Sequence, residues 1–176
     1  IPDPDPLRHE TDARGWIRAL REATGDLGLH GAGRLEAVVV SGNNPTLVPA
    51  AADGAPLANA ITWMDRRGTE EARWIAGVRG CPTDASHFLP KALWLRRNRP
   101  QVYERARWFF SCPEYVVFML TGTAATFLPT PLYTRSIMWD AETVRRLGMD
   151  DGRFPPFVAS GARVGTVSAA GAPSAP

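Results

Sequence analysis

The chain has 176 residues, of which 20 are Lys or Arg and 18 are Asp or Glu, giving a formal net charge of +2. Hydrophobic residues make up 44% of it and charged residues 22%, which is typical of one soluble globular domain. Two cysteines are too few for a disulfide scaffold, no apolar run reaches the roughly 20 residues that cross a bilayer, and no export signal opens the sequence. We therefore expect a cytoplasmic protein with no membrane partner.

The basic residues do not indicate a nucleic-acid partner. Arginine supplies every basic residue except Lys91, and the arginines are scattered among carboxylates. A surface that follows a phosphate backbone needs clustered cations in excess. The densest run, at 96–99, falls at the end of an expected helix, where cations offset the negative end of the helix dipole.

The first part of the chain contains one helical pattern and one strand pattern. Apolar residues recur at helical spacing from Asp12 to about Gly28, with Asp12 placed to cap the first turn. The run from Leu35 to Val40 is apolar almost throughout and is stopped by a turn. Such a run predicts a central strand that is covered on both faces.

The remaining patterns, taken with the first two, indicate an α/β fold. The turn signal Asp53-Gly54 lies between two strand-like runs, 46–51 and 59–64, which predicts a β-hairpin. The later expected elements are helices at 69–78 and 89–98, a strand at 107–111, helices at 115–120 and 141–147, and an extended link at 154–157. Both ends lack periodic apolar residues, so we expect a loose segment at 1–9, one domain at 10–168 and a frayed tail or linker at 169–176.

Several short sequence motifs follow one another in a characteristic order. Val38 to Gly42 leads an apolar run into a Ser-Gly loop, Asp53 to Leu57 forms an Asp-Gly turn, and Ile61 to Arg67 contains the pattern Trp-x-Asp-x-Arg. The order continues with Lys91 to Leu95, Pro100 to Tyr103, Glu114-Tyr115, Leu120 to Gly122 and Val164 to Val167. Over about residues 10 to 168, this order resembles the first domain of the FGGY carbohydrate kinases, a family that includes xylulokinase and glycerol kinase.

The resemblance implies a ribonuclease H-like fold of the actin-like ATPase type, present here in part, with a mixed sheet and flanking helices. It also implies that ATP, with Mg²⁺, phosphorylates a hydroxyl of a pentulose or related sugar. The family's phosphate-handling hairpin and catalytic Asp lie outside the matched residues. We therefore expect the chain to contribute acceptor-site residues, to bind neither ATP nor Mg²⁺ itself, and to be inactive alone. Its expected partners are a sugar or polyol and the remainder of the kinase chain, and a homodimer is left open.

Three candidate residues suit the recognition of a sugar. Trp63, carried over from the Trp-x-Asp-x-Arg phrase, offers a flat surface for sugar C–H groups, although a core position is the plain alternative. Asn43 and Asn44 offer amide donors and acceptors at a strand end, the usual place for ligands in open α/β sheets. A turn is the alternative for both, because asparagine tolerates left-handed backbone angles.

Three more candidates come from the same resemblance. Asp65 and Arg67 complete the phrase around Trp63, as site-shaping residues or as an ordinary ion pair. His87 precedes the Lys91 helix in a stretch that lies near the acceptor in the family. The three histidines of the chain lack metal-ligand spacing, so we expect no zinc site.

Departures from the family pattern leave the substrate open. The loop reads Ser-Gly-Asn-Asn-Pro-Thr at 41–46, where xylulokinases have Ser-Gly-Gln-Met-His-Gly, and Thr126-Phe127 replaces a Thr-Asp pair. The alternative function is therefore a non-catalytic module, derived from a kinase fold, that binds a carbohydrate or a protein.

Overall fold

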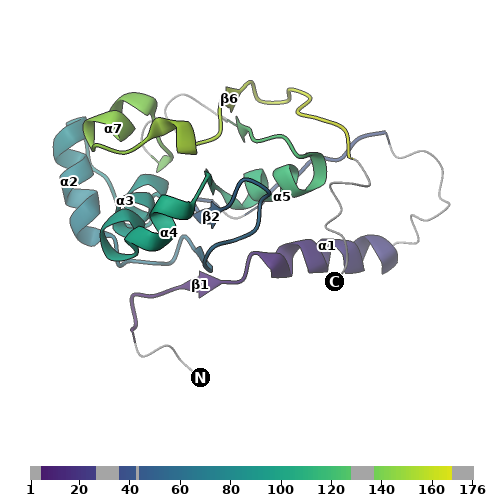
Figure 1. Cartoon of the computed structure of the whole chain (residues 1–176), viewed down its shortest axis with the longest axis horizontal. Helices are drawn as coiled ribbons and strands as arrows, with labels where there is room; N and C mark the ends of the chain where they lie inside the picture. Colours follow the sequence, from purple (N-terminus) through teal and green to yellow (C-terminus); the bar gives the residue numbers. More distant parts are fainter. Residues whose placement is uncertain (1–4, 27–35, 43, 128–136, 168–176) are drawn as a thin grey trace.

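The structure is a computed structural model of the chain, and it describes residues 5–26, 36–42, 44–127 and 137–167 (Figure 1). The helices are α1 (Arg14–Asp26), α2 (Thr69–Arg79), α3 (Phe88–Asn98), α4 (Pro100–Arg105), α5 (Cys112–Thr121) and α7 (Ala141–Arg146), with a 3₁₀ turn η1 (Asp151–Arg153). The strands are β1 (Glu10–Thr11), β2 (Val48–Ala50), β3 (Ala60–Ile61), β4 (Trp108–Phe110), β5 (Thr126–Phe127) and β6 (Phe157–Val158). The chain is therefore mixed α/β, as expected.

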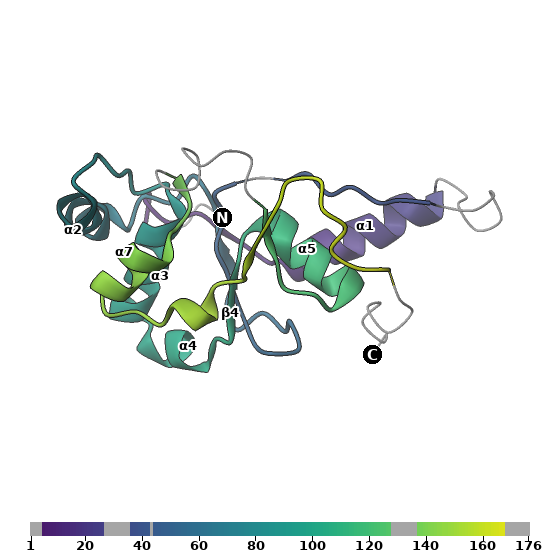
Figure 2. The same cartoon turned by 90° about the horizontal axis from the view of Figure 1, so that it is seen from above.

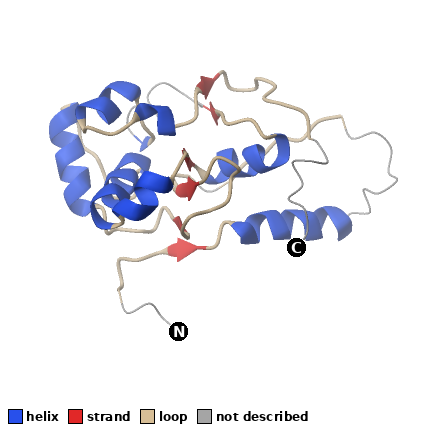
Figure 3. Ribbon diagram, in the orientation of Figure 1, coloured by secondary structure: helices blue, strands red, loops and turns tan. Residues whose placement is uncertain are grey.

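The strands form short ladders among the described residues. β1 pairs antiparallel with β3, β2 pairs antiparallel with β4, and β5 pairs parallel with β6. The expected hairpin is present, because Leu47 and Ile61 exchange both backbone hydrogen bonds, at N···O distances of 2.8 and 2.9 Å. Figure 3 shows these strands as small pieces among the helices. The mixed sheet is thus partial.

Two hydrophobic clusters lie on either side of the β2–β4 ladder. Helices α2, α3, α4 and α7 gather on one side of it, and α1 and α5 lie on the other (Figure 2). Successive strand residues point to opposite faces, so Phe109 packs with the first group and Phe110 with the second. Leu47 and Val48 divide in the same way. The hairpin and β4 therefore hold both halves of the molecule together.

The helix predictions are confirmed, and one helix was missed. α1, α2, α3, α5 and α7 all fall on the segments with helical periodicity. At the start of α1, the Asp12 carboxylate accepts a hydrogen bond from the backbone N–H of Arg14 at 3.0 Å. α5 ends at Gly122, which adopts the left-handed φ of 72°. The short α4 was not predicted, because its six residues give too few turns for a periodic pattern.

The predicted strand from Leu35 to Val40 is wrong for the residues that the structure describes. Residues 36–42 form no strand, and the side chains of Val38 and Val39 are 48% and 93% exposed. An apolar run becomes a buried strand only when neighbouring strands accept its hydrogen bonds. No described segment pairs with this one, so Val38 and Val39 remain exposed to solvent, while Val40 is partly buried against the second cluster.

The hairpin turn depends on a glycine. Gly54 has a φ of 87°, and an added Cβ would lie 2.7 Å from Met119 Sδ and 2.8 Å from Phe118 Cε1. We expect Gly54→Ala to lower the free energy of unfolding by about 2 kcal/mol or more, from strain and overpacking together. Gly80→Ala is the control, because Gly80 has a similar φ of 70° with nothing within 4 Å of the added Cβ. Urea unfolding of both variants measures the difference, and equal losses would contradict the steric part.

Candidate functional site

Two loops meet at a single buried amine. Lys91 lies in the second turn of α3 and is 2% exposed. Its Nζ donates hydrogen bonds to the carbonyl oxygens of Pro45 and His87, each at 3.1 Å, and to the carbonyl oxygen of Ser86. An ammonium group has three N–H donors, so these three carbonyls match it in number. The loop at 44–46 is thereby tied to the turn before α3.

The surroundings of Lys91 determine its charge. Burial lowers the pKa of the Lys91 amine to about 7. The carboxylates of Asp65 and Asp84 act in the opposite direction, and Arg66 adds to the lowering. Asp84 is itself paired with Arg66. Asp84 lies just before the turn whose carbonyls bind Lys91, whereas Asp65 and Arg66 follow β3 and act on the amine through charge.

Trp63 and Asn44 come at the same end of the hairpin. Leu47 and Ile61 pair antiparallel. Asn44 lies three residues before Leu47, and Trp63 lies two residues after Ile61. Trp63 is 45% exposed, so its indole is not a core residue. The side-chain oxygen of Asn44 is buried and has no hydrogen-bond partner among the described residues. An exposed aromatic face and an unsatisfied acceptor therefore lie near the loop that Lys91 holds.

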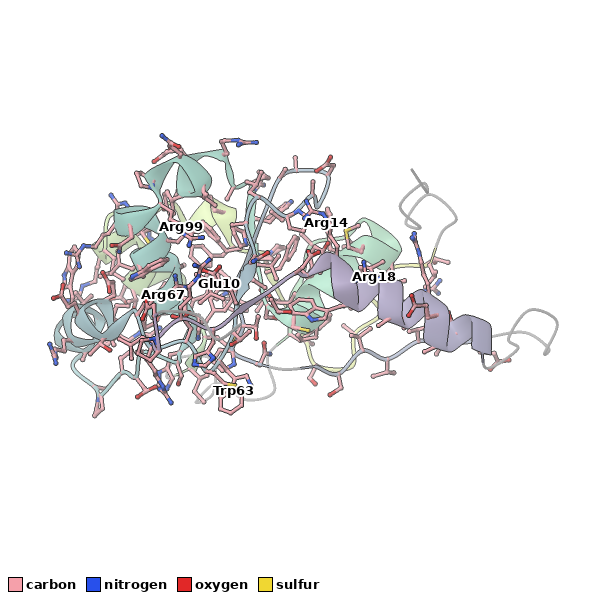
Figure 4. All side chains as sticks on the ribbon, turned by 90° about the horizontal axis from the view of Figure 1, so that it is seen from below. Glu10, Arg14, Arg18, Trp63, Arg67 and Arg99 are labelled. Carbon is pink, nitrogen blue, oxygen red and sulfur yellow. The ribbon has the colours of Figure 1, made fainter. Side chains whose placement is uncertain are left out.

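Asp65 and Arg67 belong to a buried ionic network. Arg67 donates to Asp65 through Nε and Nη2, at 3.0 and 2.8 Å to Oδ2, and to Glu10 Oε1 through Nη2 at 2.7 Å. Arg99 approaches the same Glu10 at 3.3 Å. The guanidinium of Arg67 also lies over the Trp94 ring, 4.1 Å from its centroid. Figure 4 shows Glu10, Arg67 and Arg99 together and Trp63 apart from them.

The network lowers the pKa of one of its carboxyl groups, that of Glu10. Burial opposes the ionisation of Glu10, but hydrogen bonds from Arg8 and Arg67 outweigh it and lower the Glu10 pKa. Asp65 also accepts a hydrogen bond from the backbone N–H of His9 at 2.9 Å. These contacts fasten the segment around β1 to the residues that follow β3. Asp65 and Arg67 thus support the segment that carries Trp63.

His87 directly precedes α3, and both its backbone carbonyl and its ring form hydrogen bonds. It occupies the N-cap position, and its carbonyl is one of the three acceptors of Lys91. Its ring Nδ1 accepts a hydrogen bond from the backbone N–H of Asp84 at 3.4 Å. The side chain is therefore engaged in the turn at 84–87.

A cavity of about 870 Å³ lies beside this region. Its lining comes from the extended segment 36–42 with Asn44, from α5 and the residues around it, and from residues 160–167. Glu114 lines it, is fully buried, and accepts a hydrogen bond from the Ser111 backbone N–H at 2.6 Å. Burial raises the pKa of Glu114 to about 7. Of the five sequence candidates that the structure describes, Asn44 is the one among the lining residues.

The model of the N-terminal domain of the FGGY family of carbohydrate kinases matches residues 1–175. The chain belongs to this family. It is similar to a xylulose kinase of Staphylococcus epidermidis, with 24% identity over 93% of this chain and 36% of the relative. It is also similar to a glycerol kinase of Polaromonas sp., with 29% identity over 86% of this chain and 35% of the relative.

The fold of the FGGY kinases is confirmed by a solved structure. A xylulose kinase from Rhodospirillum rubrum superposes with a TM-score of 0.81 at 21% identity, over 98% of this chain and 39% of that one. The expected family and its actin-like ATPase fold are therefore both correct. The chain spans about a third of the length of the curated relatives it matches, as the shares of 36% and 35% show.

The predicted site residues of this FGGY domain fall into two groups. Lys91 donates to the carbonyl of His87 and to that of Pro45, which follows Asn44, and Trp63 lies at the same hairpin end as Asn44. Asp65 and Arg67 lie in the buried ionic network with Glu10. Asn43 lies outside the described residues.

Three residues with unusual environments were not predicted as part of the site. Lys91 had one visible signal, as the only lysine of an arginine-rich chain in an otherwise apolar helix segment. Glu114 had a local signal in the capping-box pattern Ser111-x-x-Glu114, where its carboxyl accepts from the Ser111 N–H. Glu10 had none, because its environment arises from contacts with distant segments. Glu10 meets Arg67 across 57 positions of sequence.

The described residues of this FGGY domain contain no group of three His, Cys, Asp or Glu side chains suited to hold a metal ion. None of the helices in the described part of the chain has the length and apolarity that crossing a bilayer requires.

Proposed function

We propose that the chain is the acceptor-binding part of an ATP-dependent kinase that phosphorylates a hydroxyl of a pentulose or a related sugar in the cytoplasm. The observation that carries this proposal is the placement of an exposed Trp63 at the same hairpin end as the unsatisfied side-chain oxygen of Asn44. Sugars present both an apolar C–H face and hydroxyl donors. Trp63 offers an exposed face for the C–H groups, and Asn44, a residue that lines the cavity, carries the kind of amide that pairs with hydroxyls.

The choice of a pentulose is supported by the relatives named xylulose kinase. The relatives named glycerol kinase support the wider class of polyol and sugar acceptors. Phosphoryl transfer also needs a cradle for the ATP phosphates, a metal ion and a base for the hydroxyl proton. In this proposal the remainder of the kinase supplies all three, and the present chain orients the acceptor.

The first test is the activity of the complete protein. We expect ATP consumption that depends on one member of a panel of ketoses, aldoses and polyols. Sugar binding without ATP consumption would favour a non-catalytic carbohydrate-binding module instead. A protein that neither binds nor phosphorylates any panel member would contradict the proposal.

Trp63→Ala in the complete protein tests the site itself. We expect the KM for the sugar to rise about tenfold, which corresponds to about 1.4 kcal/mol of lost binding, with the KM for ATP and the melting temperature nearly unchanged. Trp74→Ala is a matched control, because Trp74 is 48% exposed, close to the 45% of Trp63, but lies on α2. An equal sugar KM in both variants would remove Trp63 from the site.

A further inference from the structure

The hydrogen bonds of Lys91 are directed entirely at backbone carbonyls in the described part of the chain. Pro45 lies in the loop after the extended segment, and Ser86 and His87 lie in the turn that starts α3. Pro45 is 46 positions away from Lys91. The amine therefore joins two loops that are far apart in the sequence.

Lys91 is too deeply buried to meet a substrate. Its exposure is 2%, and its Nζ is surrounded by the carbonyls it serves. The loops themselves reach further out, since Asn44, next to Pro45, is among the residues that line the cavity, and His87 is half-buried. A change at Lys91 would therefore reach a ligand only through the loops.

We propose that Lys91 is a positioning residue that sets the shape of the sugar site by tying the Asn44–Thr46 loop to the Ser86–His87 turn. This inference rests on the proposed function. Loss of the amine would leave three carbonyl oxygens without their donor and free the two loops to separate. Small displacements of groups that orient a substrate have large effects on its use.

The geometry also explains why arginine, the common cation of this chain, is absent at position 91. The three acceptors converge on one nitrogen atom, which suits a compact ammonium with three donors. A guanidinium spreads its donors over a planar fork and is larger. It would satisfy fewer of these oxygens and push the loops apart.

The experiment compares Lys91→Met with the unchanged complete protein. Methionine keeps the length and apolar stem of the side chain and removes the donors. We expect the KM for the sugar to rise at least tenfold, with the KM for ATP and the slow sugar-independent hydrolysis of ATP changed less than twofold. A sugar KM within twofold of the original protein would overturn the inference. Lys91→Arg is expected to raise the sugar KM as well, and it replaces Lys91→Met if that variant does not fold.

A control separates positioning from general stability. Leu95 is buried at 1% exposure one helical turn further along α3, so Leu95→Ala loosens the same helix without removing a hydrogen bond to either loop. We expect it to lower the melting temperature while leaving the sugar KM unchanged. A rise in sugar KM equal to that of Lys91→Met would show a mere stability effect and would overturn the inference.

The outcomes also distinguish this inference from the proposed function. If the unchanged protein phosphorylates no sugar, the proposed function fails, and the inference fails with it. If it phosphorylates a sugar and Lys91→Met leaves the sugar KM intact, the inference alone fails.

Discussion

Replacing Arg67 by alanine is expected to lower the free energy of unfolding by about 3 to 5 kcal/mol, the typical loss when one partner of a buried ion pair is removed. The Arg67 side chain is 9% exposed, and its partners Glu10 and Asp65 are 4% and 3% exposed. Without the guanidinium, two buried carboxylates would face each other with less compensation. The stacking on Trp94 would be lost as well.

Arg146→Ala is the control for Arg67→Ala. Arg146 and Glu142 form an exposed pair on α7, at 4.0 Å, with side chains 54% and 79% exposed. Such pairs contribute little, so we expect a change below about 0.5 kcal/mol. Urea unfolding at pH 7 measures both variants. A loss for Arg67→Ala as small as that of the control would show that the network does not stabilise the fold.

Glu114 is expected to make the protein less stable as the pH rises from about 4.5 to about 7. Burial raises its pKa in the folded protein to about 7, whereas the usual value is 4.5. Below both values the carboxyl is protonated in both states and costs nothing. As the pH rises, the unfolded chain loses this proton first, so stability falls by about 3 kcal/mol and then levels off above pH 7.

Glu114→Gln isolates this contribution. Glutamine cannot ionise, and its side-chain oxygen can still accept the hydrogen bond from the Ser111 N–H. We expect the difference in unfolding free energy between the two proteins to change in favour of the variant as the pH rises from 4.5 to 7. Other carboxyl groups, such as Glu10, are common to both proteins and cancel in this difference. A difference that does not vary with pH would contradict the assigned environment of Glu114.

Much of the fold could be predicted because local patterns determine it. Helical periodicity placed α1 and α3, and the Asp53-Gly54 turn placed the hairpin, since each depends on residues close in sequence. The segment 36–42 shows the limit of such reasoning. Its apolar residues indicate a buried strand, but burial depends on a partner strand that its own residues do not specify.

The site was less predictable than the fold for the same reason. The family phrase drew attention to Trp63, Asp65 and Arg67, but only the structure separates the exposed indole from the buried ion pair. The carbonyl groups around Lys91 come from backbone, which every residue carries, so no residue type in the sequence marks them. Contacts across tens of positions arise from packing and have no local signature.

The division of Phe109 and Phe110 between two clusters has a consequence for how the molecule melts. Adjacent residues of one strand anchor the interiors on its two faces, so neither interior can loosen without moving the same stretch of backbone. Heat should therefore disrupt both interiors at one temperature, in a single cooperative transition. The amide hydrogen-exchange rates of α5 and α3 should likewise rise or fall together.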